Sequence, residues 1–238
     1  MIKTHNMKKI LLVCCLLLAI GATASAQQRQ QQQQRPKVLN LERYAQSNKD
    51  LVFTTGPRVV LFGDSITDNW ARMRPGFFVE HGFVGRGISG EVTAQMLLRM
   101  RADVIDIQAS TMVLLAGIND IAENLDEYNE DATFSNIQSM VELCWMNGIR
   151  PVLCSLLPSY SFFWRPDAKN HLQKVESLNA RMQEYCARHG ITYVNYHDAL
   201  LSSDGRKIDT AYAEDTVHPN AAGYEIMEDL LLKALGYK

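Results

Sequence analysis

Residues 59–67 read Val59-Val60-Leu61-Phe62-Gly63-Asp64-Ser65-Ile66-Thr67, an apolar run that ends in a glycine, an acid and a hydroxyl. A short apolar run bounded by turn residues is typical of a strand buried on both faces, as in parallel sheets. Three further runs have this character, at 111–115, 151–156 and 191–194, and residues 83–88 form a weaker run broken by glycine. We therefore expect strands at these positions.

Longer stretches with helical spacing of their apolar residues separate these runs. The expected helices span 92–106, 134–147, 170–189 and 220–235, with Gly148 and Gly190 placed as C-terminal stops. Strands that alternate with helices predict βα units around a parallel sheet. The expected fold class is α/β, a three-layer α/β/α sandwich with a mostly parallel central sheet.

Four polar segments follow the predicted strands or precede the last helix. They are Gly63-Asp64-Ser65-Ile66-Thr67, Gly87-Ile88-Ser89-Gly90, Gly117-Ile118-Asn119-Asp120 and Asp215-Thr216-Val217-His218-Pro219. In open parallel sheets, ligands bind beyond the carboxyl ends of the strands. All four segments are therefore predicted to meet at one edge of the sheet.

The first and last of these segments carry a candidate nucleophile and a candidate base. A serine hydroxyl such as that of Ser65 becomes a good nucleophile only when a neighbouring base takes its proton. His218 has Asp215 three residues before it, and a short loop can fold that carboxylate onto the imidazole. His197, followed directly by Asp198, is a competing base.

The middle segments offer hydrogen-bond donors for a developing oxyanion. The candidates are the amides of Ser65 and Gly90 and the side chain of Asn119, and Gly87 is an alternative to Gly90. Glycine suits such a position because the backbone must approach the substrate without a Cβ in the way. Asp64 is expected to hydrogen-bond the amides of its own loop instead of serving as the triad acid.

With these four motifs in this order, the chain resembles the SGNH hydrolase superfamily, also called GDSL-type esterases and lipases. The resemblance covers Val59 to Leu235, and the family's named residues match Ser65, Gly90, Asn119 and His218, with Asp215 as the partner acid. Ile66 stands where the family name has leucine, which affects no catalytic position. The resemblance implies a flavodoxin-like sandwich, no metal or other cofactor, and ester hydrolysis through an acyl-serine.

The substrate is expected to be a short acyl ester, most simply an acetyl group, on a carbohydrate. Trp164 and Arg165, in the loop 158–166, are candidate substrate-binding residues because aromatic rings stack on sugars and arginine binds acidic groups. Trp70, five residues after Ser65, is a third candidate, and core packing remains open for it and for Phe162 and Phe163. The alternative substrates are lysophospholipids or other lipid esters and thioesters.

Two non-hydrolytic functions fit the sequence less well. A catalytically silent binding module on the same fold would tolerate loss of the catalytic positions, all five of which are filled here. Nucleotide binding at the glycine-bearing loop after Phe62 lacks the lysine and hydroxyl of phosphate-binding loops.

The N-terminus has the pattern of a secretory signal over residues 1–26. Lys3, Lys8 and Lys9 precede an apolar run at 10–20, and Ala24-Ser25-Ala26 is a cleavage site of small residues. The apolar run is short for a membrane span, and a lipid anchor at either of its two cysteines is disfavoured. We expect a periplasmic or secreted protein without stable membrane insertion after cleavage, with a glutamine-rich disordered spacer at 27–36 and one SGNH hydrolase domain at 37–238.

The charge and cysteine content narrow the remaining options. The 238-residue chain has a formal net charge of −2, which becomes more negative when the three lysines of the leader are removed. This balance argues against general nucleic-acid binding. Cys144, Cys154 and Cys186 have apolar neighbours and are expected to be small buried hydrophobes, although a disulfide between two of them remains open in an oxidising compartment.

Overall fold

The computed structural model describes residues 39–51 and 56–237. Residues 41–238 form a compact unit separate from residues 1–40, and the description below concerns this second unit. The predicted signal sequence and glutamine-rich spacer lie outside the described residues. None of the helices within the described ranges is both long and apolar enough to cross a bilayer.

Five parallel strands form the central sheet in the order β2-β1-β3-β4-β5. Their bounds are Val59–Gly63 for β1, Val84–Gly87 for β2, Thr111–Leu115 for β3, Arg150–Cys154 for β4 and Thr192–Val194 for β5. This order is that of flavodoxin-like doubly wound sheets. The predicted α/β/α sandwich with a parallel, flavodoxin-like sheet is confirmed.

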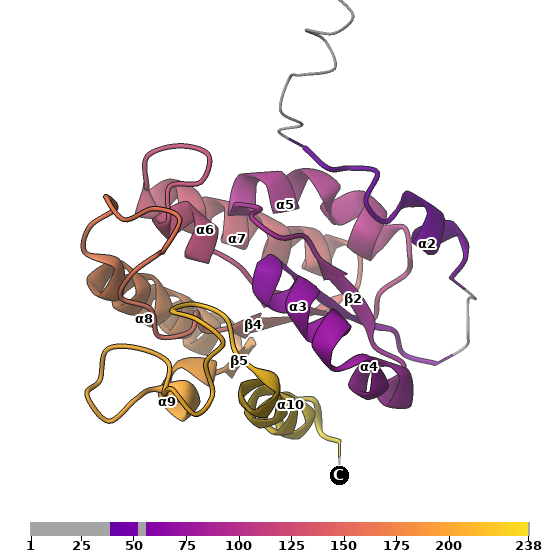
Figure 1. Cartoon of the computed structure of the whole chain (residues 1–238). Coiled ribbons are helices and arrows are strands. Elements are labelled where there is room, and N and C mark those ends of the chain that lie inside the picture. Colours follow the sequence, from indigo (N-terminus) through magenta and orange to yellow (C-terminus); the bar gives the residue numbers. More distant parts are fainter. Residues whose placement is uncertain (1–38, 52–55, 238) are drawn as a thin grey trace, which may run out of the picture. The chain divides into compact units, whose positions relative to one another are not determined.

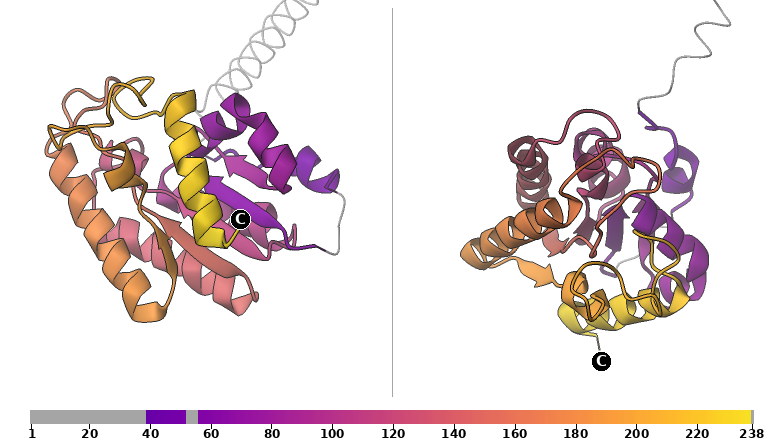
Figure 2. Two further views of the ribbon diagram at one scale, coloured as in Figure 1. Left: turned by 90° about the horizontal axis from the view of Figure 1, so that it is seen from below. Right: turned by 60° about the vertical axis from the view of Figure 1, so that its left-hand side comes forward.

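Helices cover both faces of the sheet (Figures 1 and 2). The group α3 (Ser65–Met73), α4 (Pro75–His81), α9 (Tyr196–Leu200) and α10 (Ala221–Leu235) lies on one side. On the other side lie α5 (Thr93–Met100) with the π-turn η1 (Arg101–Ile105), α7 (Glu130–Met146) and α8 (His171–His189). Two short helices complete the set, α2 (Ala45–Lys49) and α6 (Ile118–Ile121). The two layers of helices explain why every residue of β1 and β3 is buried.

The predicted helix stops are found where glycine can adopt a left-handed backbone. Gly190 caps α8 with φ of +65°, and Gly148 follows the cap of α7 with φ of +68°. The expected single helix at 92–106 is instead α5 followed by η1, and α3 and α4 form where no helix was predicted. The three cysteines of the folded unit, Cys144, Cys154 and Cys186, are buried and free, so none of them forms a disulfide.

Candidate active site

The carboxyl edge of the sheet carries a cavity of about 390 Å³. All four polar segments contribute lining residues, as does the loop after β4, and two asparagines outside them complete the lining: Ser65, Ser89, Gly90, Asn119, His218, Phe163, Trp164, Asn69 and Asn124. Two other hollows of about 410 Å³ are slightly larger, but neither is lined by Ser65 or His218. The segments predicted to meet at this edge do meet there.

Ser65 is the first residue of α3, directly after the end of β1. Asp64 caps this helix, because its Oδ1 accepts a hydrogen bond of 3.0 Å from the amide of Ile66. This contact confirms the expected role of Asp64 within its own loop. Ser65 Oγ lies 2.9 Å from His218 Nε2, which is hydrogen-bond distance for proton transfer between them.

The Asp215 carboxylate contacts both the side chain and the backbone of His218. Asp215 Oδ2 lies 2.8 Å from His218 Nδ1, while Oδ1 accepts the amides of Val217 at 2.7 Å and His218 at 2.8 Å. Burial raises the pKa of the Asp215 carboxyl, but the hydrogen bonds from the imidazole and the two amides outweigh it, and the pKa is lowered overall. An ionised Asp215 therefore faces Nδ1 and leaves Nε2 of His218 free to accept a proton from Ser65.

The competing histidine, His197, lies in α9 and does not line the cavity. Its Nδ1 is 3.0 Å from Asp198 Oδ1, so its ring has a carboxylate partner, while Ser155 Oγ accepts from the backbone amide of His197 at 2.8 Å and not from its ring. The geometry therefore pairs Ser65 with His218 and not with His197.

Gly90 and Asn119 both line the cavity. Gly90 has φ of +83°, a conformation that favours glycine. Asn119 is buried, and its Nδ2 donates to the carbonyl oxygen of Glu91 at 3.0 Å. Gly87 does not line the cavity: it ends β2 against α3, where a Cβ would collide with the backbone at Asp68. Of the two glycines left open by the sequence, Gly90 is the one that lines the cavity together with Ser65.

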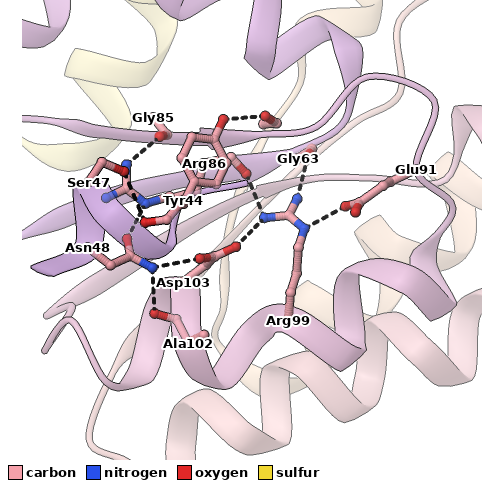
Figure 3. A network of polar contacts seen from close by, with 11 residues as sticks. Tyr44, Ser47, Asn48, Gly63, Gly85, Arg86, Glu91, Arg99, Ala102 and Asp103 are labelled. Carbon is pink, nitrogen blue, oxygen red and sulfur yellow. Dashed lines mark hydrogen bonds and ion pairs between the residues drawn. The ribbon is translucent and has the colours of Figure 1, made fainter. Parts of the chain in front are cut away.

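A buried arginine that the sequence did not suggest connects two of these segments (Figure 3). Arg99, in α5, donates to the carbonyl oxygens of Gly63 at 2.9 Å and Arg86 at 3.0 Å, and it pairs with Glu91 and Asp103. Burial raises the pKa of the Glu91 carboxyl, and the Arg99 guanidinium opposes this shift. Arg99 thus ties the residue before Asp64 to the residue after Gly90, which fixes the spacing of the two segments.

Trp70 is not part of the cavity, which corrects the expectation that it binds substrate. Its side chain is 2% exposed, stacks on Tyr224 at 5.5 Å between ring centroids, and donates through Nε1 to Glu228 at 3.1 Å. Trp70 therefore belongs to the core between α3 and α10, and its ring is unavailable to a ligand.

The candidate residues of the loop after β4 lie in different environments. Trp164 lines the cavity with its ring centroid 6.3 Å from that of His218, and Phe163 beside it is 68% exposed. Phe162 is buried in the core. Arg165 is exposed, does not line the cavity, and donates to the carbonyl oxygen of Glu123 at 2.6 Å. The structure therefore places Trp164, but not Arg165, where it can touch a substrate.

Asp64 is expected to make the protein's stability sensitive to pH. Burial raises the pKa of this carboxyl to about 7, opposed by the hydrogen bond from Ile66. A folded-state pKa above the ordinary value of about 4 favours the neutral form, so the free energy of unfolding falls as pH rises from about 4 to about 7. Asp64→Asn is neutral throughout, so its Tm relative to wild type should increase over that range. Thermal melts of both proteins across pH measure this, and parallel curves would contradict it.

Comparisons with known proteins agree on one family. Residues 61–226 match the GDSL-like lipase/acylhydrolase family. A GDSL-like lipase from Bacteroides thetaiotaomicron VPI-5482 is 43% identical with a TM-score of 0.82, covering 84% of this chain and 98% of that one. A protein described as an acylhydrolase, from Bacteroides fragilis NCTC 9343, is 41% identical with a TM-score of 0.82, covering 85% and 98%.

More distant structures share the fold alone. An acetylxylan esterase from Geobacillus stearothermophilus is 18% identical with a TM-score of 0.62, covering 79% of this chain and 98% of that one. A search of curated protein sequences found no match.

Proposed function

The chain belongs to the GDSL-like lipase/acylhydrolase family and is an ester-hydrolysing enzyme, and we propose that Ser65, His218 and Asp215 carry out the hydrolysis. The observation that carries this proposal is the continuous set of contacts from Ser65 Oγ to His218 Nε2 at 2.9 Å and from His218 Nδ1 to Asp215 Oδ2 at 2.8 Å. A hydroxyl, an imidazole and a carboxylate in this order form a nucleophile, its base and the group that orients the base.

In the first half of the reaction, Ser65 Oγ attacks the carbonyl carbon of the ester while His218 Nε2 takes the hydroxyl proton. The carbonyl π electrons move to the oxygen, where the amides of Ser65 and Gly90 and the Nδ2 group of Asn119 donate hydrogen bonds. When this intermediate collapses, the bond to the alcohol breaks and His218 gives its proton to the departing alkoxide. The acyl group remains on Ser65.

In the second half, His218 takes a proton from water and the resulting hydroxide attacks the acyl-serine. The tetrahedral intermediate uses the same three donors, and its collapse returns the proton to Ser65 Oγ and releases the carboxylic acid. One ester and one water thus become one acid and one alcohol, with the enzyme regenerated.

The proposed substrate is a short acyl ester, most simply an acetate, on a carbohydrate. Support comes from the cavity of about 390 Å³ and from the aromatic rim that half-buried Trp164 and exposed Phe163 form at its side, since flat aromatic faces suit sugar rings. The predicted secretory signal supports an enzyme that acts in the periplasm or outside the cell. The 68% exposure of Phe163 also favours a second candidate, a lipid or thioester acyl chain lying on the same rim.

A panel of nitrophenyl esters of increasing acyl length, together with acetylated oligosaccharides, separates these candidates. The proposal predicts the highest kcat/KM for acetate, a steep fall with chain length, and release of acetate from the oligosaccharides. Rates that rise with chain length, with no release of acetate from sugar, would assign the site to lipid-like substrates.

Trp164→Ala is expected to raise KM for an acetylated oligosaccharide about tenfold while raising KM for a nitrophenyl acetate much less. A sugar ring would lose its stacking surface, whereas the small ester offers less area for Trp164 to contact. Trp164→Phe is the matched control, because it keeps a flat ring at the same position and should retain the lower KM. Equal changes of KM for both substrates in Trp164→Ala would remove this residue from sugar binding.

A further inference from the structure

A chain of side-chain hydrogen bonds runs from the loop after β4 to the segment that carries Asn119. Trp164 Nε1 donates to Asn124 Oδ1 at 2.8 Å, and Asn124 Nδ2 donates to Asn119 Oδ1 at 2.8 Å. Asn124 Nδ2 also donates to the carbonyl oxygen of Gly90 at 3.3 Å. Asn124 therefore contacts both segments that provide the proposed oxyanion donors outside the nucleophile loop.

The donor-to-acceptor direction of these hydrogen bonds is set by Trp164. The indole nitrogen of Trp164 can only donate, so the side-chain oxygen of Asn124 must face it. The NH₂ group of Asn124 then faces Asn119 and can only donate to an acceptor there. Asn119 must in consequence present its amide oxygen to Asn124 and its NH₂ group to the opposite side.

To stabilise the oxyanion, the Asn119 NH₂ group must lie on that opposite side. Among the described residues, one hydrogen of Asn119 Nδ2 is donated to the carbonyl oxygen of Glu91 at 3.0 Å, and the other is left for the cavity that Asn119 lines. A reversed amide would place an oxygen next to the developing oxyanion and next to the Glu91 carbonyl, where both contacts are repulsive. The orientation of one amide group thus decides whether Asn119 stabilises or opposes the transition state.

We propose that Asn124 is a positioning residue that holds the Asn119 amide in its donating orientation, and that Trp164 sets the orientation of Asn124. The hydrogen bonds from Trp164 through Asn124 to Asn119 are called the relay below. This inference rests on the proposed role of Asn119 as an oxyanion donor. It gives Trp164 two separable functions, since its ring can contact substrate while its N–H group orients the donor.

The loop that carries Trp164 is held by contacts with Glu123, the residue before Asn124. Arg165 donates to the Glu123 carbonyl oxygen at 2.6 Å, and Lys174, at the start of α8, pairs with the Glu123 carboxylate at 3.1 Å. These contacts keep the indole of Trp164 within reach of Asn124. Arg165, expected from the sequence to bind substrate, instead helps to seat this loop.

The sharpest test compares Asn124→Asp with Asn124→Ala, using kcat for nitrophenyl acetate at alkaline pH. An ionised aspartate keeps the size of asparagine and still accepts from Trp164, but it offers Asn119 only an acceptor and so draws the Asn119 NH₂ group away from the cavity. We expect kcat of Asn124→Asp to fall about tenfold or more, and at least as far as that of Asn124→Ala. A purely structural role predicts the opposite order, with the isosteric aspartate close to wild type.

Trp164→Phe provides a second, independent variant should the Asn124 substitutions impair folding. It removes the indole donor and keeps a ring, so kcat should fall several-fold while KM for nitrophenyl acetate changes little. An unchanged kcat in Trp164→Phe would overturn its part in the relay.

A double-mutant cycle with Asn119→Ala separates the relay from the function on which it rests. Asn119→Ala alone should lower kcat about 10²–10³-fold, and adding Asn124→Asp to it should cause no further loss. A loss under tenfold for Asn119→Ala would overturn both the oxyanion role and the relay. A full loss for Asn119→Ala, together with wild-type kcat for Asn124→Asp, would overturn the relay alone.

Asn129→Ala is the control for nonspecific damage near this segment. Asn129 caps α7 by accepting from the amide of Ala132 at 3.0 Å, five residues beyond Asn124, and it does not line the active-site cavity. This variant should lower Tm and leave kcat unchanged. A kcat loss in Asn129→Ala equal to that of Asn124→Asp would show that local destabilisation accounts for the effect, and would overturn the relay.

Discussion

Ser65→Ala is expected to lower kcat for nitrophenyl acetate by roughly 10⁴–10⁶-fold while leaving Tm close to that of wild type. The substitution removes the atom that forms the acyl intermediate in the proposed mechanism, and the fold has little dependence on it because Asp64 still caps α3. Steady-state kinetics with a sensitive chromogenic assay and a thermal melt of the same preparation measure both quantities.

The outcome that would contradict this expectation is substantial activity in Ser65→Ala. Ser89 is the other hydroxyl that lines the cavity, and its Oγ donates to Asp68 at 2.8 Å instead of meeting a histidine. If Ser65→Ala were active and Ser89→Ala inactive, the nucleophile would have to be reassigned to Ser89.

His218→Ala is expected to lower kcat by a similar factor, roughly 10⁴–10⁶-fold, because it removes the imidazole that lies at hydrogen-bond distance from the Ser65 hydroxyl. The loss should appear in kcat, since the alanine removes proton transfer and leaves the cavity open to substrate. The measurement is kcat and KM for nitrophenyl acetate. A thermal melt of the same preparation confirms that the variant is folded.

His197→Ala is the matched control for this variant. His197 also has a carboxylate partner, Asp198, at 3.0 Å, but it lies outside the cavity. Its kcat should equal that of wild type. The assignment of the base would be reversed if His197→Ala lost activity and His218→Ala kept it.

The parts of the fold that depend on local pattern could be predicted from the sequence. The strands at 59–63 and 111–115 are fully buried in the structure, and continuous apolar runs are the direct signature of that environment. The meeting of Ser65 and His218 followed from topology, because parallel strands bring their carboxyl ends to one edge. Asp215 could be assigned from its spacing of three residues before His218.

It was harder to predict which side chains of a helix point into the core. Trp70 was a candidate for substrate binding because it lies five residues after Ser65, whereas the helix that begins at Ser65 turns Ile66 and Trp70 together into the core. The spacing of four between these two apolar residues was the available signal. It was missed because no helix was predicted between residue 63 and the weaker run at 83–88.

The roles of Arg99 and Asn124 could not have been found from local pattern at all. Each depends on partners distant in the sequence: Arg99 contacts Gly63, 36 positions away, and Trp164 lies 40 positions from Asn124. A buried arginine or a half-buried asparagine has no periodic signature of its own. The contacts of Asn124 appear only when the loop after β4 packs against residues 123–124, and those of Arg99 only when α5 packs against the ends of β1 and β2.

In the mechanism that we propose, Ser65 forms a covalent acyl intermediate with the help of His218. The most direct test treats the protein with a dialkyl nitrophenyl phosphate, which phosphorylates activated serines, and locates the adduct by peptide mass spectrometry. The account predicts one adduct, on the peptide that contains Ser65, formed together with loss of activity and greatly slowed in His218→Ala. An inactivated enzyme that carries its adduct on any other residue would contradict the account.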